Sequence, residues 1–596
     1  MKPARRILAV LLGAALLLGS LCACGSTSGM DADTDTNTEN SVAQQLYDTP
    51  VDAPDLTNAT TITLSGTDDV TVSDGGVYVL TGTLTDGRVL VNAPDADVTL
   101  VLQDADITCS DSSALYIYKI YKAASVLVYL PDGTASTLTD GSSYDYGDGV
   151  SSAADEEPNA CLYAKSDLII AGGGTLTVTG NAGNGITGKD TLKIEDTAVS
   201  VTAANHGING KDCLVLKQAD VTVTSGGDAL RATNDSGTAL GCVLIGASAL
   251  TLTAGEDGIQ AETTLTLFDT TGTVTSGGSG GALADDVSAK GIKAGTDITV
   301  HSGSYTLDCA DDAVHANGSV TVSGGTFAVT TGDDGVHADN AVTITDGTLS
   351  IRECYEGIEG QTIDISGGTI DITASDDGLN AAGGADRSGF GGRGPDSFGG
   401  SSDSRITISG GTLRIDASGD GIDSNGALTV SGGETYVSGP TSDGDSALDH
   451  DGSATVTGGT VIAAGYSGMA QNFGTDSTQG SILLTSRSTS TETIRVTDAS
   501  GSVLAEFAPA KAYSCVIVST PALRQGGTYT VTMGGESTDV TLESLIYGTG
   551  GMGGGMGGGM GGQPGGGNMG MPPDGNGGGM GTPPDGNGGK GGRPGQ

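Results

Sequence analysis

A short unit recurs along the chain, and its spacing restricts the possible folds more than any other feature of the sequence. The unit is a polar residue, then Gly or Ala, an aliphatic residue, a polar residue and a small residue, as in Asp334-Gly335-Val336. The aliphatic residues lie at 186, 208, 230, 259, 292, 314, 336, 358, 379 and 422, so most successive gaps are 21 or 22 residues. The longer gaps include Gly-rich stretches at 277–289 and 383–404, which we interpret as loop insertions. A fixed period of this length predicts a solenoid of stacked repeats.

Each repeat reads as three short strands. In 334–355 (DGVHADNAVTITDGTLSIRECY), apolar and polar residues alternate around Val342, Ile344, Leu349 and Ile351, and Gly, Asp or Asn bounds each segment. Three strands in one period make one turn of a parallel β-helix, whose turns stack at about 4.8 Å. The fixed Leu/Asn frame of leucine-rich repeats is missing. We therefore predict an all-β fold, a right-handed parallel β-helix with three strands per turn.

The composition agrees with this fold and excludes one class of partner. The chain has 72 Asp+Glu against 25 Lys+Arg, a formal net charge of −47, no Trp and only 6 Phe. Binding to nucleic acid depends on Lys and Arg neutralising phosphates, so we exclude nucleic acid as a partner. Few large aromatics indicate a thin core of small aliphatic residues. The 36% of hydrophobic residues is too many for a disordered acidic chain.

The N-terminus predicts export and lipid anchoring. Residues 1–24 combine a basic start with an apolar stretch too short to span a membrane as a mature helix. The sequence LCACG at 21–25 resembles the lipobox of bacterial lipoproteins and nominates Cys24 as the acylated residue; a plain secretory signal is the alternative. We expect a lipid-anchored monomer on the extracellular face of the bacterial cell membrane, attached to that membrane only through the lipid.

The rest of the chain divides by composition. Residues 25–54 are rich in Ser, Thr, Asp and Asn and predict a flexible tether. The parallel β-helix is predicted for 55–480, with 55–150 as the N-terminal cap and first turns. Residues 481–547 lose the period and predict a small β domain at the C-terminal end. The Gly- and Met-rich tail, 548–596, cannot bury a core and is predicted to be disordered. The seven cysteines after the signal contain no C-x-x-C pair, and we expect reduced thiols in the core.

One column of the stacked repeats is acidic and predicts a cation site. It lies two residues before each aliphatic residue, and a second acid often precedes it. Stacked carboxylates about 5 Å apart raise one another's pKa unless a cation intervenes, and Ca²⁺ takes six to eight oxygen ligands. The alternative is that each Asp caps a turn without metal. The predicted Ca²⁺ ligands are Asp257, Asp311, Asp312, Asp333, Asp334, Glu356, Asp376, Asp377 and Asp420.

Three stretches, in order along the chain, carry a family resemblance. They are GVYVLTGTL at 76–84, TLTDG at 137–141 and GTLTVTGN at 174–181, followed by the repeated units. Together they resemble a family of secreted bacterial carbohydrate-binding β-helix proteins over about residues 60–475. The resemblance implies a pectate-lyase-like shape, calcium binding and association with cell-wall polysaccharides such as polygalacturonate and cellulose. Catalysis is not established for that family.

A second column, one residue after each aliphatic residue, is polar and is predicted to point outward. Its members suit sugar hydroxyls, and we predict carbohydrate binding by Arg231, Lys293, His315, His337 and Asn380. A solvated face without a ligand would show the same pattern. The stacked histidines could ligate a transition metal, although the sequence shows no third ligand. Tyr116, Tyr118 and Tyr121 fit either a sugar platform or core packing, with packing favoured.

Three functions remain open after the sequence is read. We favour calcium-dependent, non-catalytic binding of an acidic, polygalacturonate-like polysaccharide, with cellulose as a further ligand. A polysaccharide lyase or hydrolase is the first alternative, with Arg231, Lys290 and Lys293 beside acidic positions. Asp-Asp pairs on several turns argue against it, because catalysis requires a unique constellation. The third possibility is a structural adhesin without a sugar ligand.

Overall fold

The computed structural model describes residues 42–94, 96–119, 125–148, 150–155, 157–277, 287–382 and 403–548. These residues all belong to the first of two compact units, Met1–Gly553; the second unit is Gly554–Gln596. The predicted signal with Cys24, most of the predicted tether, Tyr121 and nearly all of the Gly/Met tail lie outside the described residues. Within the described part, no helix is both long enough and apolar enough to cross a membrane.

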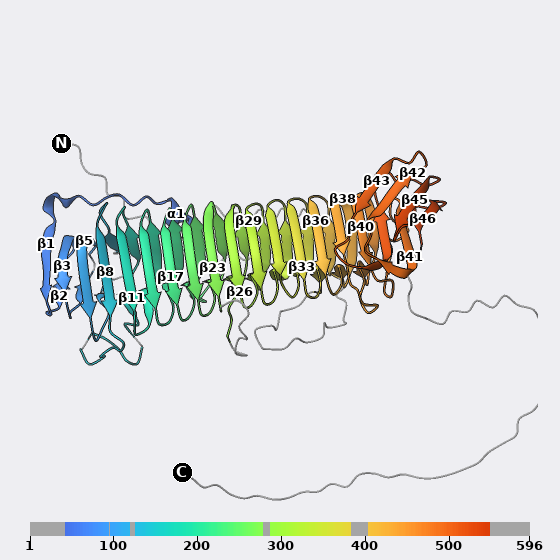
Figure 1. The fold of residues 1–596 in the computed structure, drawn as a ribbon. Coiled ribbons are helices and arrows are strands. Elements are labelled where there is room, and N and C mark those ends of the chain that lie inside the picture. Colours follow the sequence, from blue (N-terminus) through green and yellow to red (C-terminus); the bar gives the residue numbers. More distant parts are fainter. Residues whose placement is uncertain are drawn as a thin grey trace, which may run out of the picture. The chain divides into compact units, whose positions relative to one another are not determined.

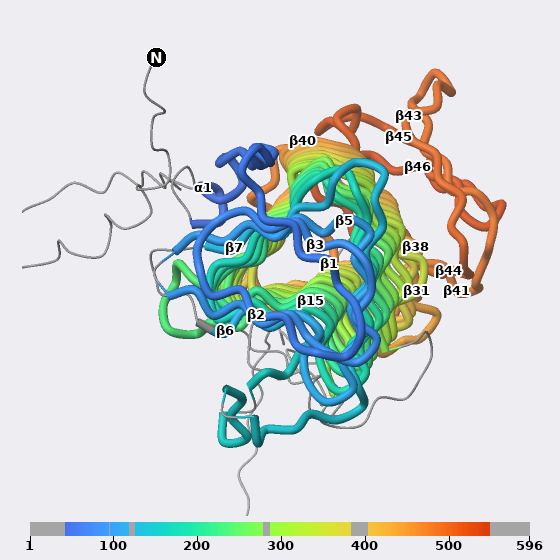
Figure 2. Tube along the Cα trace, turned by 90° about the vertical axis from the view of Figure 1, so that its left-hand side faces the viewer, coloured from blue at the N-terminus to red at the C-terminus, as the bar shows by residue number. Residues whose placement is uncertain are grey.

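The fold is a parallel β-helix, as predicted (Figure 1). Strands pair in parallel and in register with the strand one turn away, which gives three ladders along the solenoid. Figure 2 looks along the solenoid and shows the turns superimposed around a common centre. The backbone groups of one turn are therefore satisfied by its two neighbours.

Ladder I contains the aliphatic residues of the repeated unit. Its strands are β2 (Val70–Val72), β4 (Val89–Asn92), β6 (Leu115–Lys119), β9 (Ala160–Ala164), β12 (Asn184–Gly188), β15 (Ile208–Gly210), β18 (Leu230–Ala232), β21 (Ile259–Ala261), β24 (Ile292–Ala294), β27 (Val314–Ala316), β34 (Leu379–Ala381), β37 (Ile422–Ser424) and β39 (Asp449–His450).

Ladder II follows ladder I in each turn. Its strands are β7 (Val126–Tyr129), β10 (Leu168–Ala171), β13 (Thr191–Glu195), β16 (Cys213–Lys217), β19 (Cys242–Gly246), β22 (Leu265–Phe268), β25 (Ile298–Val300), β28 (Ser319–Val322) and β35 (Arg405–Ile408).

Ladder III completes the turn. Its strands are β8 (Ala135–Asp140), β11 (Thr175–Gly180), β14 (Ala198–Ala203), β17 (Asp220–Ser225), β20 (Ala249–Ala254), β23 (Thr270–Ser276), β26 (Gly303–Cys309), β29 (Thr326–Thr331), β31 (Thr348–Glu353), β33 (Thr369–Ala374) and β36 (Thr412–Ala417).

Some strands run through a corner and belong to two ladders. β30 (Val336–Ile344) and β32 (Ile358–Ile365) join ladders I and II, and β38 (Ala427–Ser438) and β40 (Ala454–Gly465) join ladders II and III. At the N-terminal end, β1 (Thr60–Gly66), β3 (Gly76–Leu84) and β5 (Val98–Cys109) are similarly paired.

The strands at the C-terminal end are mostly antiparallel. β44 (Tyr513–Ser519) pairs antiparallel with both β40 and β41 (Ser481–Ser490), and β47 (Ile546–Tyr547) adds to β41. A separate four-stranded sheet has the order β43 (Val503–Phe507), β42 (Ile494–Asp498), β45 (Thr528–Met533) and β46 (Glu536–Thr541). These strands cover the last turn of the solenoid, so its final edge is paired.

The described part of the predicted tether is not free of structure. Helix α1 (Val42–Asp48) packs Ala43 against the outer face of β16 and β19 and is followed by the short 3₁₀ helix η2 (Leu56–Asn58). Tyr47 meets Phe268 with ring centroids 5.1 Å apart. The prediction of a flexible tether is therefore wrong for this segment, because its apolar residues find an apolar strip on ladder II.

The core is one continuous column of small aliphatic side chains. Ile208 lies in register between Ile186 and Leu230, and all three are fully buried. The seven cysteines in the described residues are all buried and free, as predicted. Such a core has little spare volume, since each side chain touches its equivalents in the turns before and after it.

Ile208→Ala should lower the free energy of unfolding by about 2–5 kcal/mol, because it opens a cavity that rigid neighbouring turns cannot fill. The control Thr222→Ala changes an exposed side chain of β17 and should cost less than about 0.5 kcal/mol. Denaturant unfolding monitored by circular dichroism measures both. Equal costs would contradict the stacked core.

Candidate functional site

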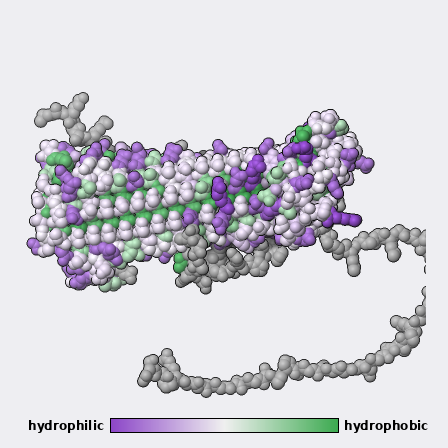
Figure 3. Space-filling view, in the orientation of Figure 1, coloured by the Kyte–Doolittle hydropathy of each residue, from purple (hydrophilic) through white to green (hydrophobic). Residues whose placement is uncertain are grey.

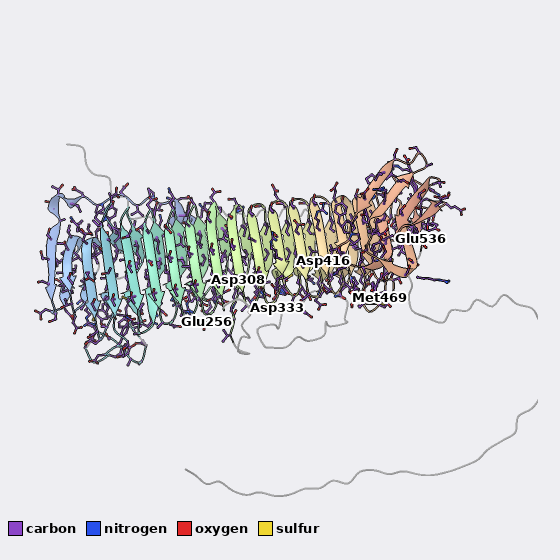
Figure 4. The ribbon with its side chains drawn as sticks, viewed as in Figure 1. Glu256, Asp308, Asp333, Asp416, Met469 and Glu536 are labelled. Carbon is purple, nitrogen blue, oxygen red and sulfur yellow. The ribbon has the colours of Figure 1, made fainter. Side chains whose placement is uncertain are left out.

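The acidic column lies at the corner where each ladder III strand turns into ladder I. Asp334, for example, stands between the end of β29 at Thr331 and the start of β30 at Val336. Figure 4 labels Glu256 and Asp333, which lie along this edge of the solenoid. The column therefore runs parallel to the solenoid axis, and its members come from successive turns.

The first function of these acids is to satisfy backbone groups of the following turn. In seven pairs along the column, the backbone N–H of the equivalent residue one turn later donates to a side-chain oxygen. The pairs are His206 to Asn184 (3.2 Å), Asp257 to Asp228 (3.1 Å), Lys290 to Asp257 (2.9 Å), Asp334 to Asp312 (3.0 Å), Glu356 to Asp334 (3.2 Å), Asp420 to Asp377 (2.6 Å) and Ser446 to Asp420. The alternative from the sequence, that these side chains cap turns without a metal, therefore describes part of their role. They cap the following turn rather than their own.

In the first half of the column, the protein's own cations face the acids. Arg231 Nη1 lies 3.0 Å from Asp228 Oδ2, and Lys293 Nζ lies 3.0 Å from Asp257 Oδ2. These pairs join the acidic column to the polar column three residues later. Arg231 and Lys293, both members of the polar column, thus form ion pairs with carboxylates of the protein itself, and both side chains remain partly exposed.

Lys290 occupies an acidic position of the repeat and brings a positive charge into the column. Its Nζ lies 2.9 Å from Asp311 Oδ1 and 2.6 Å from Asp312 Oδ2. Burial alone would raise the pKa of Asp312, but Lys290 and His315 hold it well below its usual value. Asp311 and Asp312, two predicted calcium ligands, are thus already paired with an ammonium group.

His315 and His337 follow Lys293 in the polar column, and both are buried. The rings of His315 and His337 stack with centroids 4.8 Å apart and planes 9° apart. His315 is 5% exposed and His337 and Asn380 are 1% exposed, so the prediction that this column faces solvent is wrong for these three. The reason is that each side chain lies against the equivalents in adjacent turns and against the acidic column: His315 Nδ1 is 2.8 Å from Asp312 Oδ2, and Asn380 Nδ2 donates to Glu356 Oε2 at 3.0 Å.

The second half of the column brings acids close to one another. Oxygens of Asp377, Asp420 and Asp423 lie within 4.8 Å of one another. Among the described residues, no Lys or Arg side chain forms an ion pair with Asp377 or Asp420. Burial, with neighbouring carboxylates as the second cause for Asp377, raises the pKa of Asp377 to about 9 and that of Asp420 to about 8. Burial and nearby acids also raise the pKa of Glu356 well above its usual value.

The structure groups six of the nine predicted ligands into three clusters. Asp311, Asp312 and Asp333 form one; Asp334 lies with His337 and Glu359; Asp377 and Asp420 lie with Asp423. Asp376 adjoins Asp377, and Asp257 lies with Lys293. The sequence analysis did not place Glu359 and Asp423 in these clusters. Both occupy the polar column: the register places Glu359 beside His337 of the preceding turn, and Asp423 lies three residues after Asp420.

A further surface was not predicted. On the outer face of ladder III, exposed or half-buried hydroxyl side chains, nearly all of them threonines, alternate with buried residues, and the register aligns them in two rows. One row is Thr177, Ser200, Thr222, Thr251, Thr273 and Thr306, and the other is Thr179, Thr202, Thr224, Thr253 and Thr275. Figure 3 shows this face as near-white rows along the solenoid. The repeated T-x-T pattern is the sequence signal that identifies it.

Tyr116 belongs to the packing rather than to a sugar platform. It is fully buried and meets Tyr163 and Tyr118 edge to face, with centroids 5.7 and 5.6 Å apart. Tyr116 and Tyr163 occupy the polar column in its first turns, where the column is aromatic and not charged. The packing interpretation is confirmed for Tyr116.

Comparison with known proteins agrees with the resemblance inferred from the repeats. Residues 66–335 match the family model described as carbohydrate-binding domain-containing protein. A curated protein with that same description, from Acetivibrio thermocellus, is 36% identical over 136 residues. That match covers 23% of this chain and 45% of the relative, so it spans less than half of the relative's length. The resemblance to carbohydrate-binding domain-containing proteins is thereby confirmed.

A solved structure described as a polysaccharide lyase-like protein from C. thermocellum, studied as a gadolinium derivative, is also similar. It is 25% identical, and the likeness covers 48% of this chain and 96% of that chain with a TM-score of 0.32. At that TM-score the likeness is too low to inform the function of this chain.

The raised pKa values predict how stability depends on pH and calcium. The neutral forms of Asp377 and Asp420 are favoured in the folded state, so their contribution to stability is fully present below the ordinary Asp value of 3.8 and is lost as the pH rises through about 8 and 9. With EDTA present, the melting temperature should fall between mildly acidic and alkaline pH. Ca²⁺ binds the ionised carboxylates and should reduce that fall.

Asp420→Asn keeps an oxygen that can accept the Ser446 N–H and removes one charge. This variant should flatten the pH dependence in EDTA and weaken the stabilisation by Ca²⁺. Differential scanning calorimetry at matched ionic strength measures both effects. A wild-type melting temperature that is independent of Ca²⁺ at alkaline pH would contradict the assignment.

Proposed function

We propose that this protein is a cell-surface lipoprotein that binds an acidic polysaccharide through calcium held at the second half of the acidic column, without cleaving it. Support for a carbohydrate ligand comes from the family match over residues 66–335. The observation that carries the calcium proposal is the cluster of Asp377, Asp420 and Asp423, whose oxygens converge and whose pKa values at Asp377 and Asp420 are raised.

Calcium suits this cluster chemically. It prefers oxygen ligands, takes six to eight of them and tolerates irregular geometry. Three carboxylates fill only part of that coordination, so positions remain for water and for a carboxylate of the ligand. A uronic acid polymer supplies such carboxylates along its length. Calcium therefore explains how a chain with a net charge of −47 could hold a polyanion.

The proposed location follows from the N-terminus. Acylation at Cys24 would attach the protein to the membrane, and the solenoid would project from it as a monomer. A binding module held at the surface keeps a polysaccharide close to the cell. This part rests on the lipobox resemblance in the sequence.

The ion pairs favour binding over lyase chemistry. A lyase needs a base that gives up its proton near neutral pH. Lys290 contacts two carboxylates, which raise its pKa despite burial, and Lys293 and Arg231 are each held by an acid. Lys290 is thus held in its protonated form, and the other two candidate bases are each engaged in an ion pair. A flat absorbance trace for unsaturated sugar ends, with Ca²⁺ added, is the corresponding expectation.

The threonine rows favour cellulose as a second ligand. Hydroxyls repeat in step with the strands, about every 4.8 Å along the solenoid, on a face of mostly exposed side chains. A regular array of this kind suits an ordered, neutral polysaccharide surface. This second candidate surface lies on ladder III and requires no cation.

Retention on polygalacturonate should depend on calcium. EDTA should elute the protein, and readdition of Ca²⁺ should restore retention. Asp420→Asn should weaken retention by about tenfold or more, as loss of a charged ligand typically does. The matched control Asp371→Asn removes an equal charge from the exposed face of β33 and should behave as wild type. Retention unchanged by EDTA would contradict the mechanism, and no retention on any acidic or neutral glycan would favour the adhesin.

Cellulose pull-down separates the two surfaces. Thr251→Lys places a charge in the centre of one threonine row and should reduce binding to cellulose several-fold, because the long side chain prevents close contact. It should leave polygalacturonate retention unchanged. Cellulose binding that is lost in EDTA and unaffected by Thr251→Lys would assign both ligands to the acidic column.

A further inference from the structure

His337 lies at the centre of a mixed nitrogen and oxygen cluster. Its Nδ1 is 2.6 Å from Glu359 Oε2 and 3.2 Å from Asp334 Oδ2. The three residues come from two successive turns, because Glu359 in β32 is the register partner of His337 in β30. One ring nitrogen thus faces two carboxylate oxygens. An N–H at that position has a single proton and can be fully shared with only one of them.

The opposite side of the ring is also occupied. His337 Nε2 lies 3.4 Å from Asp339 Oδ1. Histidines that bind metals through one ring nitrogen almost always direct the other toward a carboxylate or carbonyl, which fixes the tautomer and makes the ligating nitrogen more basic. Asp339 is that outer partner here, because it faces Nε2. The ring nitrogen that could bind a metal is therefore Nδ1.

Burial makes the charge of this cluster hard to accommodate without a cation. His337 is 1% exposed and Asp334 is 5% exposed. Three carboxylates surround one imidazole, so the set stays negative even when the ring is protonated. His315, the stacked neighbour, is directed at Asp312 and Asn317 and adds no ligand to this point. Buried charges of this kind are normally paired or coordinate a metal.

We propose that Asp334 Oδ2, His337 Nδ1 and Glu359 Oε2 bind a divalent first-row transition ion of the Zn²⁺ type, with Asp339 orienting the ring of His337. Zn²⁺ accepts imidazole nitrogen and carboxylate oxygen at about 2.0–2.2 Å, and three protein ligands leave a fourth position for water. Imidazole is a poor ligand for Ca²⁺ and a good one for Zn²⁺, Co²⁺ and Ni²⁺. The site is therefore chemically distinct from the all-oxygen cluster at Asp377, and it does not depend on the proposed polysaccharide function.

The test titrates the purified full-length chain with Co²⁺, a Zn²⁺ substitute whose visible absorption reports its coordination. One equivalent of Co²⁺ should give an intense tetrahedral-type spectrum, which Zn²⁺ should abolish and excess Ca²⁺ should leave in place. Mass spectrometry of the metal content after dialysis against Zn²⁺ should find one ion per chain. No change in the Co²⁺ spectrum with folded wild-type protein would overturn the proposal.

Two conservative variants assign the ligands. Glu359→Gln removes the charge of a partly exposed ligand, and Asp339→Asn changes only the partner of Nε2. Both should weaken Co²⁺ binding by about 10- to 100-fold. The control Asp423→Asn should weaken Ca²⁺ binding and leave the Co²⁺ spectrum unchanged. Circular dichroism checks folding, and Co²⁺ affinity that is equal in wild type and Glu359→Gln would overturn the assignment.

Discussion

The hydrogen bonds between successive turns control the rest of this structure. Each short strand satisfies its backbone only by pairing with the same segment one turn earlier and one turn later, as Ile208 does between Ile186 and Leu230. In-register pairing places equivalent side chains above one another at strand spacing. A residue type that recurs at one position of the repeat therefore forms a column along the solenoid. Aliphatic columns gain from this by packing, whereas columns of like charge are penalised.

The acidic column shows how the chain manages that penalty. Most carboxylates there have a structural task, since an oxygen of Asp228, Asp257, Asp312, Asp334, Asp377 and Asp420 accepts a backbone N–H of the next turn. The negative charge, which is shared by both oxygens of a carboxylate, must still be balanced. Arg231, Lys290 and Lys293 balance it in the first half of the column through ion pairs with N–O distances of 2.6–3.0 Å. Beyond the histidines, Asp377 and Asp420 have no such Lys or Arg among the described residues, and burial together with neighbouring carboxylates raises their pKa values. The calcium hypothesis is therefore restricted from the whole column to the part that contains Asp377 and Asp420.

The sequence predicted the acidic column correctly, but it did not predict the contacts of Lys290 or the burial of His315. The 22-residue spacing was sufficient to align Asp312, Asp334 and Asp377 in one column, because register in a solenoid follows directly from sequence distance. The same spacing did not show that Lys290 would form ion pairs with two acids of the following turn. A long side chain has several carboxylates within its reach, and spacing does not say which of them it contacts. It also failed for His315, which was expected in solvent. A polar residue in a strand is expected to face water, but this one is buried by stacking on the neighbouring turn and by its carboxylate partner.

The sequence by itself determined the class of fold, the position of the repeat and the identity of the columns, because those depend on periodicity and turn chemistry, which are local properties. It also carried the resemblance to carbohydrate-binding domain-containing proteins. Only the tertiary structure decided which acids are neutralised by lysines and which are not, that Glu359 and Asp423 complete clusters, and that helix α1 packs on ladder II. The physical reason is that charge balance and burial depend on distances between groups in different turns, and those distances exist only once the turns are stacked.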